Sequence, residues 1–493
     1  MMGSVIDRKS LLLVVVSTLL ALLLCEGGLR VLARHRPIPP VPDTGPPSPA
    51  DLNRATRHVA QLPALADTDR RWFLEDPPPL TSRSEPAPAE TGRYREYERR
   101  GIYPAQAQYI WNRKYLESKR CLADGGFRNY PDTVLSFDPP GGTAHPPFRF
   151  PVSSTLPSRL VTNQFGLRGP ELALVKPPKT IRIAFAGAST TITTHSFDFS
   201  PAERVVFWLN RYAQAHGYDA HFEVLNGGRE GITSEDIASI VRDELAALDP
   251  DLVVYYEGAN QFAAPDLAAL HWGSALMLNA LEPLLTRTAI GNLIVRAGTR
   301  AGGEPWKPWH YLKWPDGVDP RAPNVDSPNL PLRLPAIVHA LDSIREALRP
   351  GGGRLLLCSF AWLASDGLVL PRAAHRYIYE QLNRDQWPLR YGDIRRLADF
   401  QNLVFRRYAA SRDIPFLDVA GVLPRDPDLF ADAVHMTETG ERVKAWVIFQ
   451  QLAPVVRQEI ESGHLPRRGP SPNLPPPASY KTAEISVRCP EKR

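Results

Sequence analysis

Five short apolar runs, separated by stretches with helical periodicity, constrain the fold of this chain more than any other feature. The runs occupy residues 181–187, 221–228, 251–260, 353–360 and 414–419. The helical stretch after the second run starts with Thr233 and has Asp236 three residues later, which is typical of a helix N-terminus. Strands that alternate with helices predict a parallel sheet covered by helices on both faces. In such sheets, functional sites form at the carboxyl ends of the strands.

The N-terminal segment is the second informative feature. Arg8 and Lys9 precede an uncharged run over residues 11–25, and its continuation through Val31 reaches the ~20 residues that a membrane-spanning helix needs. No A-x-A-like cleavage site follows, and bulky Leu24 precedes Cys25, which argues against lipoprotein processing there. We predict that residues 1–36 are an uncleaved membrane anchor, with a cleaved signal segment as the alternative. Basic residues flank the run on both sides and leave the orientation open; the catalytic region is expected outside the cytoplasm.

The rest of the chain divides by composition. We expect a proline-rich linker over residues 37–52, an accessory region over 53–150, a main domain over 151–463 with an insertion at 262–331, and a proline-rich, poorly ordered tail over 464–493. The insertion follows the third apolar run, so it is expected to fold over the edge of the sheet that carries the site. It contains a group of aromatic residues, Trp306, Trp309, Tyr311 and Trp314.

Charge and cysteine content exclude several classes of function. The net charge of +5 is small for 493 residues, and no long basic run is interleaved with aromatic residues, so nucleic acid is not an expected partner. The four cysteines, Cys25, Cys121, Cys358 and Cys489, form no CxxC pair, and HExxH is absent. We therefore expect no metal and no cofactor. Cys121 and Cys489 are candidates for a disulfide outside the cytoplasm.

A serine follows the first apolar run, where a parallel-sheet enzyme places a nucleophile. Residues 182–191 read RIAFAGASTT, and Ser189 stands just past the expected strand end. An acyl-transfer serine needs a base, a group that orients the base, and hydrogen-bond donors for an oxyanion. Suitable residues follow the later runs: Gly228 in LNGGREG, Asn260 in EGANQ, and Asp432 and His435 in FADAVHMTETG.

Each of these motifs has an ordinary structural explanation when it stands alone. A Gly-x-Ser is most often a turn, an asparagine after a strand caps a loop, and D-x-x-H is a surface hydrogen bond or two metal ligands. Together they fall in order beyond successive predicted strand ends, and one chemistry uses all of them. On a turn, the spacing of Asp432 and His435 lets the carboxylate reach Nδ1 while Nε2 points at a hydroxyl. The combination predicts a nucleophilic serine.

The four blocks resemble those of the SGNH (GDSL-type) hydrolases, which are named for Ser, Gly, Asn and His. GAST, NGGREG, GAN and DAVH are similar to the blocks of that family, and the resemblance covers residues 160–455 apart from the insertion. It implies a flavodoxin-like three-layer α/β sandwich around a mostly parallel five-stranded sheet. It also implies these roles: nucleophile Ser189, base His435, orienting Asp432, and an oxyanion hole formed by the N–H groups of Ser189 and Gly228 and the side chain of Asn260.

The chain departs from the family pattern at two positions. Ala188 stands where the best-known members have Asp, and Gln261 follows Asn260 where many have Asp. Both lie outside the implied catalytic set. The segment 161–171, VTNQFGLRGPE, resembles the lead-in to the serine block of larger membrane-anchored members, and it leaves the roles of Asn163 and Arg168 open. An α/β-hydrolase fits less well because GxSxG is absent.

Three functions are compatible with this set. The first is a membrane-tethered serine esterase that removes acyl groups, O-acetyl above all, from glycans. The second is an O-acyltransferase that uses the same triad but excludes water from the acyl-enzyme. The third is a glycan-binding or envelope scaffold protein without catalysis. Trp306, Trp309 and Trp314 are candidate sugar-stacking residues, and a packed loop core explains them equally well.

Overall fold

The computed structural model describes most of the chain. It covers residues 8–34, 47–81, 83, 95, 133–138, 150–270, 288–291, 304, 307, 310–467 and 471–484, except for gaps at 64, 66, 151, 157, 194–196, 371–374, 472 and 477–478. All structural statements below concern these residues.

A five-stranded parallel sheet forms the centre of the molecule. Its strands lie in the order β3 (His221–Asn226), β2 (Thr180–Gly187), β4 (Leu252–Tyr256), β7 (Arg354–Cys358) and β8 (Phe416–Leu417). Ile183 of β2 is paired with Val224 on one side and Leu252 on the other. The order reverses between the strands next to β2, so the carboxyl ends of β2, β3 and β4 meet at a topological switch point. The predicted α/β fold is confirmed by this sheet.

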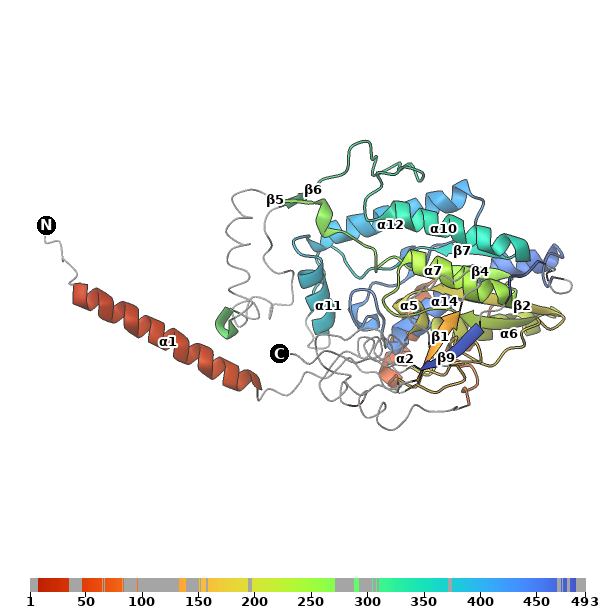
Figure 1. Ribbon diagram of the computed structural model, residues 1–493, viewed down its shortest axis with the longest axis horizontal. Coiled ribbons are helices and arrows are strands. Elements are labelled where there is room, and N and C mark those ends of the chain that lie inside the picture. Colours follow the sequence, from red (N-terminus) through yellow and green to blue (C-terminus); the bar gives the residue numbers. More distant parts are fainter. Residues whose placement is uncertain are drawn as a thin grey trace.

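Helices cover both faces of the sheet (Figure 1). On one face, α6 (Pro201–His216) and α14 (Glu438–Glu461) pack against each other; on the other, α10 (Leu334–Leu348) contacts α7 (Ser234–Ile240) and α12 (Tyr391–Ser411). Three shorter helices, α5 (Ser189–Ile192), α11 (Arg376–Glu380) and α13 (Val419–Val422), complete the set. The capping box predicted at Thr233 and Asp236 forms at the start of α7. The arrangement is a three-layer sandwich.

The core continues from the sheet into the N-terminal region. All eight residues of β2 are buried, as expected for a central strand without a polar face. On the face covered by α6 and α14, the ring centres of Trp208 and Trp446 lie 5.1 Å apart, and the ring centre of Phe73 lies 5.7 Å from that of Trp446. Phe73 belongs to a 3-10 turn over Arg70–Leu74. Part of the expected accessory region therefore packs into the core of the main domain.

The chain ends differ from their predicted organisation. Helix α2 (Pro49–Gln61) begins inside the segment expected to be a linker, because Ser48 and Asp51 form a capping box there. In the tail, Arg467 forms ion pairs with Asp249 and Asp251, and β9 (Ser479–Glu484) pairs antiparallel with β1 (Thr133–Asp138). We predicted a poorly ordered tail from its proline content. Composition alone cannot predict the ion pairs that Arg467 forms with two buried carboxylates.

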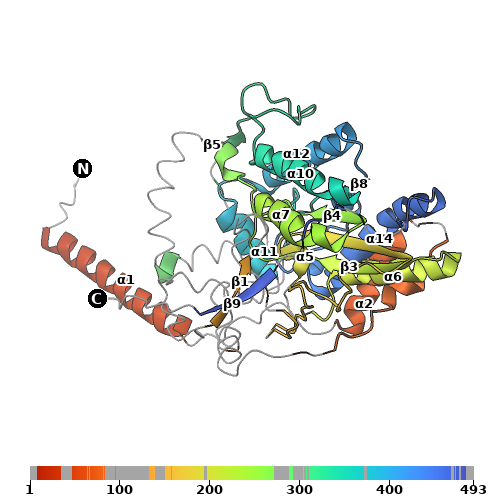
Figure 2. The same ribbon diagram turned by 45° about the vertical axis from the view of Figure 1, so that its right-hand side comes forward.

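An apolar helix, α1 (Arg8–Arg34), projects from the rest of the protein (Figures 1 and 2). Its segment Leu12–Leu32 has a mean hydropathy of 2.3 and is not buried within the protein, so it is long and apolar enough to cross a membrane. In the insertion, β5 (Ala268–Leu270) and β6 (His310–Leu312) form a two-stranded antiparallel sheet. Cys25 and Cys358 are free thiols, and Cys121 and Cys489 lie outside the described residues.

Candidate active site

Ser189 lies in a tight turn between a strand and a helix. Strand β2 ends at Gly187 and α5 begins at Ser189. A Cβ on Gly187 would lie 2.3 Å from the carbonyl oxygen of Tyr256, so only glycine allows the strand to end this close to β4. The Thr191 hydroxyl donates to the same carbonyl at 3.0 Å and fixes the turn to the sheet. Ser189 is left partly exposed at the carboxyl edge of the sheet.

His435 connects Ser189 to a carboxylate on the loop before α14. Its Nε2 lies 2.7 Å from Ser189 Oγ, and its Nδ1 lies 2.7 Å from Asp432 Oδ2. The other oxygen of Asp432 accepts the backbone N–H groups of Val434 at 2.9 Å and His435 at 2.7 Å. The carboxylate is therefore held by three donors when Nδ1 is protonated, which leaves Nε2 free to accept the serine proton. The structure thus brings Ser189 together with a histidine and a carboxylate that lie more than 240 positions later in the sequence.

The electrostatics of this pair suit a base. Burial alone disfavours the charged form of the imidazole, but the charge of Asp432 and its hydrogen bond outweigh burial and raise the pKa of His435 above its ordinary value. The pKa of Asp432 is lowered, since the charge and hydrogen bonds of His435 outweigh the cost of burying the carboxylate. An imidazolium at this position would be stabilised by the neighbouring carboxylate.

The three candidate oxyanion donors differ in their exposure and in the hydrogen bonds that they already make. Asn260 is exposed, and its side-chain Nδ2 donates to the carbonyl of Ile232 at 2.7 Å, which uses one of two amide hydrogens. The N–H of Ser189 lies in the first turn of α5, where no preceding residue of the helix can accept it. The N–H of Gly228 is buried and donates to Asn226 Oδ1 at 3.1 Å.

Gly228 is required for another reason. A Cβ at this position would lie 2.7 Å from the backbone nitrogen of Ile192, within α5. The glycine therefore lets the loop after β3 approach the turn that carries Ser189.

Glu257, which the sequence analysis did not single out, holds the asparagine loop. Its Oε1 accepts the N–H groups of Ala259 at 2.7 Å and Asn260 at 2.8 Å. Burial raises the pKa of this carboxyl against the lowering effect of those hydrogen bonds. Glu257 thus fixes the backbone from which the Asn260 side chain projects.

Arg168 acts on the other end of the serine turn. Its buried guanidinium pairs with Glu203 at 3.2 Å and donates to the carbonyls of Ile192 at 3.0 Å, Thr193 at 2.6 Å and Phe197 at 3.0 Å. The carbonyls of Ile192 and Thr193 are among those that α5 leaves unsatisfied where it ends, and Phe197 lies in the chain that follows the helix. Asn163 holds the loop before Arg168 by accepting the N–H of Leu167 at 3.1 Å. The open roles of Asn163 and Arg168 are thus structural: both support the turn that presents Ser189.

A buried lysine lies behind the same turn. Lys444 Nζ donates to the carbonyl of Thr190 at 2.8 Å, pairs with Glu441 Oε2 at 2.7 Å, and lies 5.1 Å from the centre of the Tyr256 ring. The side chains of Lys444 and Glu441 are each 1% exposed. No local sequence pattern marks this pair, because its significance depends on the carbonyl that it meets.

The aromatic group of the insertion is only partly described. Trp306 and Trp309 lie outside the described residues. The ring of Trp314 packs 4.8 Å from that of Phe400 on α12, so it contributes to the core around that helix. Among the residues that the structure describes, there is no group of three or more metal-ligating side chains.

Comparison with known proteins gives structural similarity only. No protein-family model and no curated protein matches the chain. The chain is similar to a lipase/acylhydrolase from Enterococcus faecalis (15% identity, TM-score 0.31, covering 56% of this chain and 96% of that one). It is also similar to a GDSL-like lipase from Bacteroides thetaiotaomicron (15%, 0.27, 57% and 88%) and to the acetylxylan esterase Axe2 from Geobacillus stearothermophilus (15%, 0.30, 55% and 94%). Since these scores and identities are low, the fold is established by the chain's own sheet order and register.

Proposed function

We propose that this protein is a serine esterase of the SGNH type, tethered to a membrane by α1, that hydrolyses O-acyl groups, O-acetyl above all, on glycans. The single observation that carries the proposal is the hydrogen-bonded chain from Asp432 through His435 to Ser189, with both links at 2.7 Å. The sequence resemblance of the four blocks supports the same reading.

The proposed reaction has two halves. Ser189 Oγ attacks the ester carbonyl while His435 Nε2 takes the serine proton, and a tetrahedral oxyanion forms. The oxyanion collapses, the alcohol leaves with the proton from His435, and an acyl-serine remains. Water then gives a proton to His435 and attacks the acyl-serine. The second tetrahedral intermediate collapses to the carboxylic acid, and His435 returns the proton to Ser189 Oγ.

The oxyanion would be stabilised by donors that are already in place. The Ser189 N–H and the second amide hydrogen of Asn260 are the principal candidates, because neither is used by the strand or helix next to it. The N–H of Gly228 joins them only by sharing its hydrogen between the oxyanion and Asn226 Oδ1. An exposed Asn260 and a partly exposed Ser189 allow a large substrate to approach this edge.

The test is release of p-nitrophenol from p-nitrophenyl acetate by the full chain in detergent, compared with its Ser189→Ala variant. We expect turnover in the wild-type protein and loss of turnover in the variant at unchanged thermal stability. Activity that survives in the folded variant would refute the nucleophile. Absence of turnover in both, from folded samples and on acetylated xylan as well, would favour the scaffold function.

An assay with added acceptor sugars distinguishes an acyltransferase from an esterase. An esterase releases acetate at the same rate with or without them, whereas a transferase forms an acetylated acceptor at the expense of free acetate. Mass spectrometry of the acceptor distinguishes the two outcomes.

A further inference from the structure

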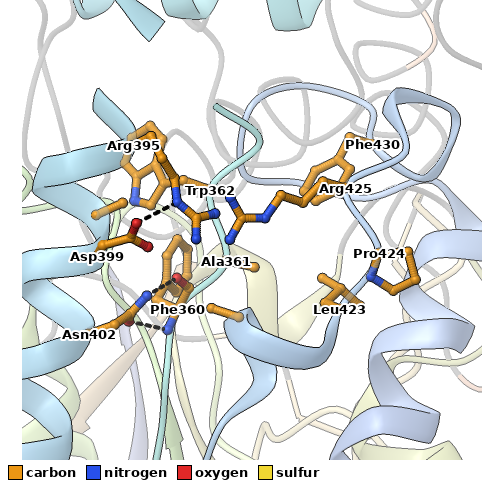
Figure 3. A pocket seen from close by; sticks show the side chains of 12 residues that line it. Phe360, Ala361, Trp362, Arg395, Asp399, Asn402, Leu423, Pro424, Arg425 and Phe430 are labelled. Carbon is orange, nitrogen blue, oxygen red and sulfur yellow. Dashed lines mark hydrogen bonds and ion pairs between the residues drawn. The ribbon is translucent and has the colours of Figure 1, made fainter. Parts of the chain in front are cut away.

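A groove with converging arginines lies beside the candidate active site. We call it the arginine groove and define it by Phe360, Trp362, Arg395, Asp399, Asn402 and Arg425 (Figure 3). It lies between the loop after β7, helix α12 and the segment 423–430. The inner part has a cavity volume of about 10 Å³ and the adjoining outer part about 250 Å³; both are lined by Arg395, Asp399, Asn402 and Ala420. A small inner cleft thus opens into a wider basin.

The charges in the inner cleft are not balanced. Figure 3 shows the guanidinium groups of Arg395 and Arg425 pointing toward one another near Trp362. Arg395 pairs with Asp399 at 2.7 Å, and Asp399 is the only carboxylate among the residues that line the inner cleft. Among the described residues, Arg425 forms no ion pair. Two facing guanidinium groups repel each other, and an anion between them would relieve that repulsion with charge-assisted hydrogen bonds.

The groove is built on a fixed floor. Asn402 of α12 accepts the backbone N–H of Phe360 at 2.7 Å and donates to its carbonyl at 2.9 Å, which ties the loop after β7 to the helix. Trp362, on the same loop, is 5% exposed, yet its indole N–H has no acceptor among the described residues. A buried donor without a partner is costly and uncommon in a native protein. The indole nitrogen is itself shielded from solvent, so a ligand in the cleft reaches this donor only after the lining side chains move.

The wall of the groove also borders the candidate active site. The ring of Trp362 lies 4.6 Å from that of Phe262, two residues after Asn260. The N–H of Leu363 donates to the carbonyl of Ala433 at 2.8 Å, inside the loop that carries Asp432 and His435. Only β4 separates β7 from β2 in the sheet, so their carboxyl ends lie roughly 10 Å apart. The groove and Ser189 therefore lie at the same edge of the sheet, within the length of one short oligosaccharide.

We propose that the arginine groove binds a carboxylate of the substrate, and that the enzyme acts on acidic, uronate-containing acylated glycans. This inference rests on the proposed esterase function, because it assigns the substrate class of that site. Arg395 and the exposed Arg425 hold the carboxylate of one sugar residue at the mouth of the inner cleft, whose own volume of about 10 Å³ admits about one water, and an ester elsewhere on the same oligosaccharide is presented to Ser189.

Binding is measured first, independently of turnover. Calorimetry on the full-length Ser189→Ala chain in detergent compares a short oligogalacturonate with its carboxyl-reduced, neutral counterpart. We expect the acidic form to bind more tightly by about tenfold, the scale of a hydrogen-bonded charge pair, and Arg425→Gln to abolish the difference. Equal binding of the two forms would overturn the proposal. Inorganic phosphate that binds as tightly as the oligogalacturonate would also overturn it, because the groove would then be a site for free anions.

Two further variants sharpen the test. Asp399→Asn removes the carboxylate that competes for Arg395, so it should tighten oligogalacturonate binding, opposite in sign to Arg425→Gln. Arg407→Gln is the matched control: Arg407 is an exposed arginine of α12 that lines neither part of the groove. A loss of binding in Arg407→Gln equal to that in Arg425→Gln would indicate general charge attraction and contradict a specific site.

Measurements of turnover then test the arginine groove and the proposed esterase function independently of each other. In Arg425→Gln, we expect KM for acetylated oligogalacturonate to rise about tenfold while kcat/KM for p-nitrophenyl acetate stays unchanged. A wild-type protein that cleaves p-nitrophenyl acetate but shows no preference for the acidic substrate refutes the inference and leaves the esterase intact. A wild-type protein without any esterase activity refutes the proposed function, whatever the groove binds.

Discussion

The carboxylate of Asp432 controls which nitrogen of His435 carries the proton, and Asp432→Asn tests this directly. Two backbone N–H groups and the imidazole converge on Asp432, at 2.9 Å, 2.7 Å and 2.7 Å. An asparagine that keeps its oxygen toward the backbone donors turns its NH₂ toward Nδ1. The imidazole must then carry its proton on Nε2, 2.7 Å from Ser189 Oγ, where it can no longer accept the serine proton.

The expected loss in kcat/KM is about 10⁴-fold, or about 5.4 kcal/mol of transition-state stabilisation, which is the scale for a triad in the wrong tautomer. The pH profile adds a second readout. His435 must be neutral to act, and Asp432 raises its pKa, so wild-type activity is lost as the pH falls through a value above the ordinary 6.5. In Asp432→Asn this acid limb moves to lower pH, because the charge that raised the pKa is gone.

The assay is kcat/KM for p-nitrophenyl acetate between about pH 5 and pH 9, with the full chain in detergent. Asp426→Asn is the matched control, because Asp426 lies on the same segment and pairs with His58 at 2.9 Å. The control should retain its rate and acid limb. Activity of Asp432→Asn within about tenfold of wild type, or an unmoved acid limb, would refute the reasoning.

Two other substitutions test the surroundings of the serine. Asn260→Ala should lower kcat by about 10²–10³-fold with little change in KM, because an oxyanion donor acts in the transition state; a normal kcat would remove Asn260 from the mechanism. Lys444→Met leaves Glu441 as a buried, unpaired carboxylate, so urea denaturation should show a loss of about 3–5 kcal/mol in the free energy of unfolding. The double variant with Glu441→Leu should recover most of that loss, and a single variant as stable as wild type would contradict the pairing.

The order of the elements could be predicted from the sequence, whereas their ends could not. Buried parallel strands are nearly continuous apolar runs, so each of the five runs contains one strand. The run at 251–260 gives a strand only over Leu252–Tyr256, because Glu257 turns its carboxylate back onto the following N–H groups. The run at 414–419 gives only Phe416–Leu417, after which Asp418 caps α13.

The candidate site was predictable only where the chemistry restricts residue type. A nucleophile, a base and an orienting carboxylate must each be one of a few residue types, so they can be recognised in the sequence. The structure brings Ser189, His435 and Asp432 within hydrogen-bond distance. The segment 161–171 drew attention to Arg168 without indicating its role, and no pattern marked Lys444, because each acts on a backbone carbonyl and any residue supplies a carbonyl. Such contacts are decided by tertiary packing, which local sequence does not encode.

The short distance in sequence between α1 and α2 limits how far the globular domain can lie from α1. Fourteen residues separate Arg34 from Pro49, and a fully extended chain of that length spans at most about 50 Å. Helix α2 is fixed to the globular body, since Arg54 pairs with Asp428 at 3.0 Å and His58 with Asp426 at 2.9 Å. With α1 in a bilayer, the domain is tethered close to the membrane surface. An esterase held in this way would act on glycans that emerge from that surface or lie against it, and would not reach material deposited farther out.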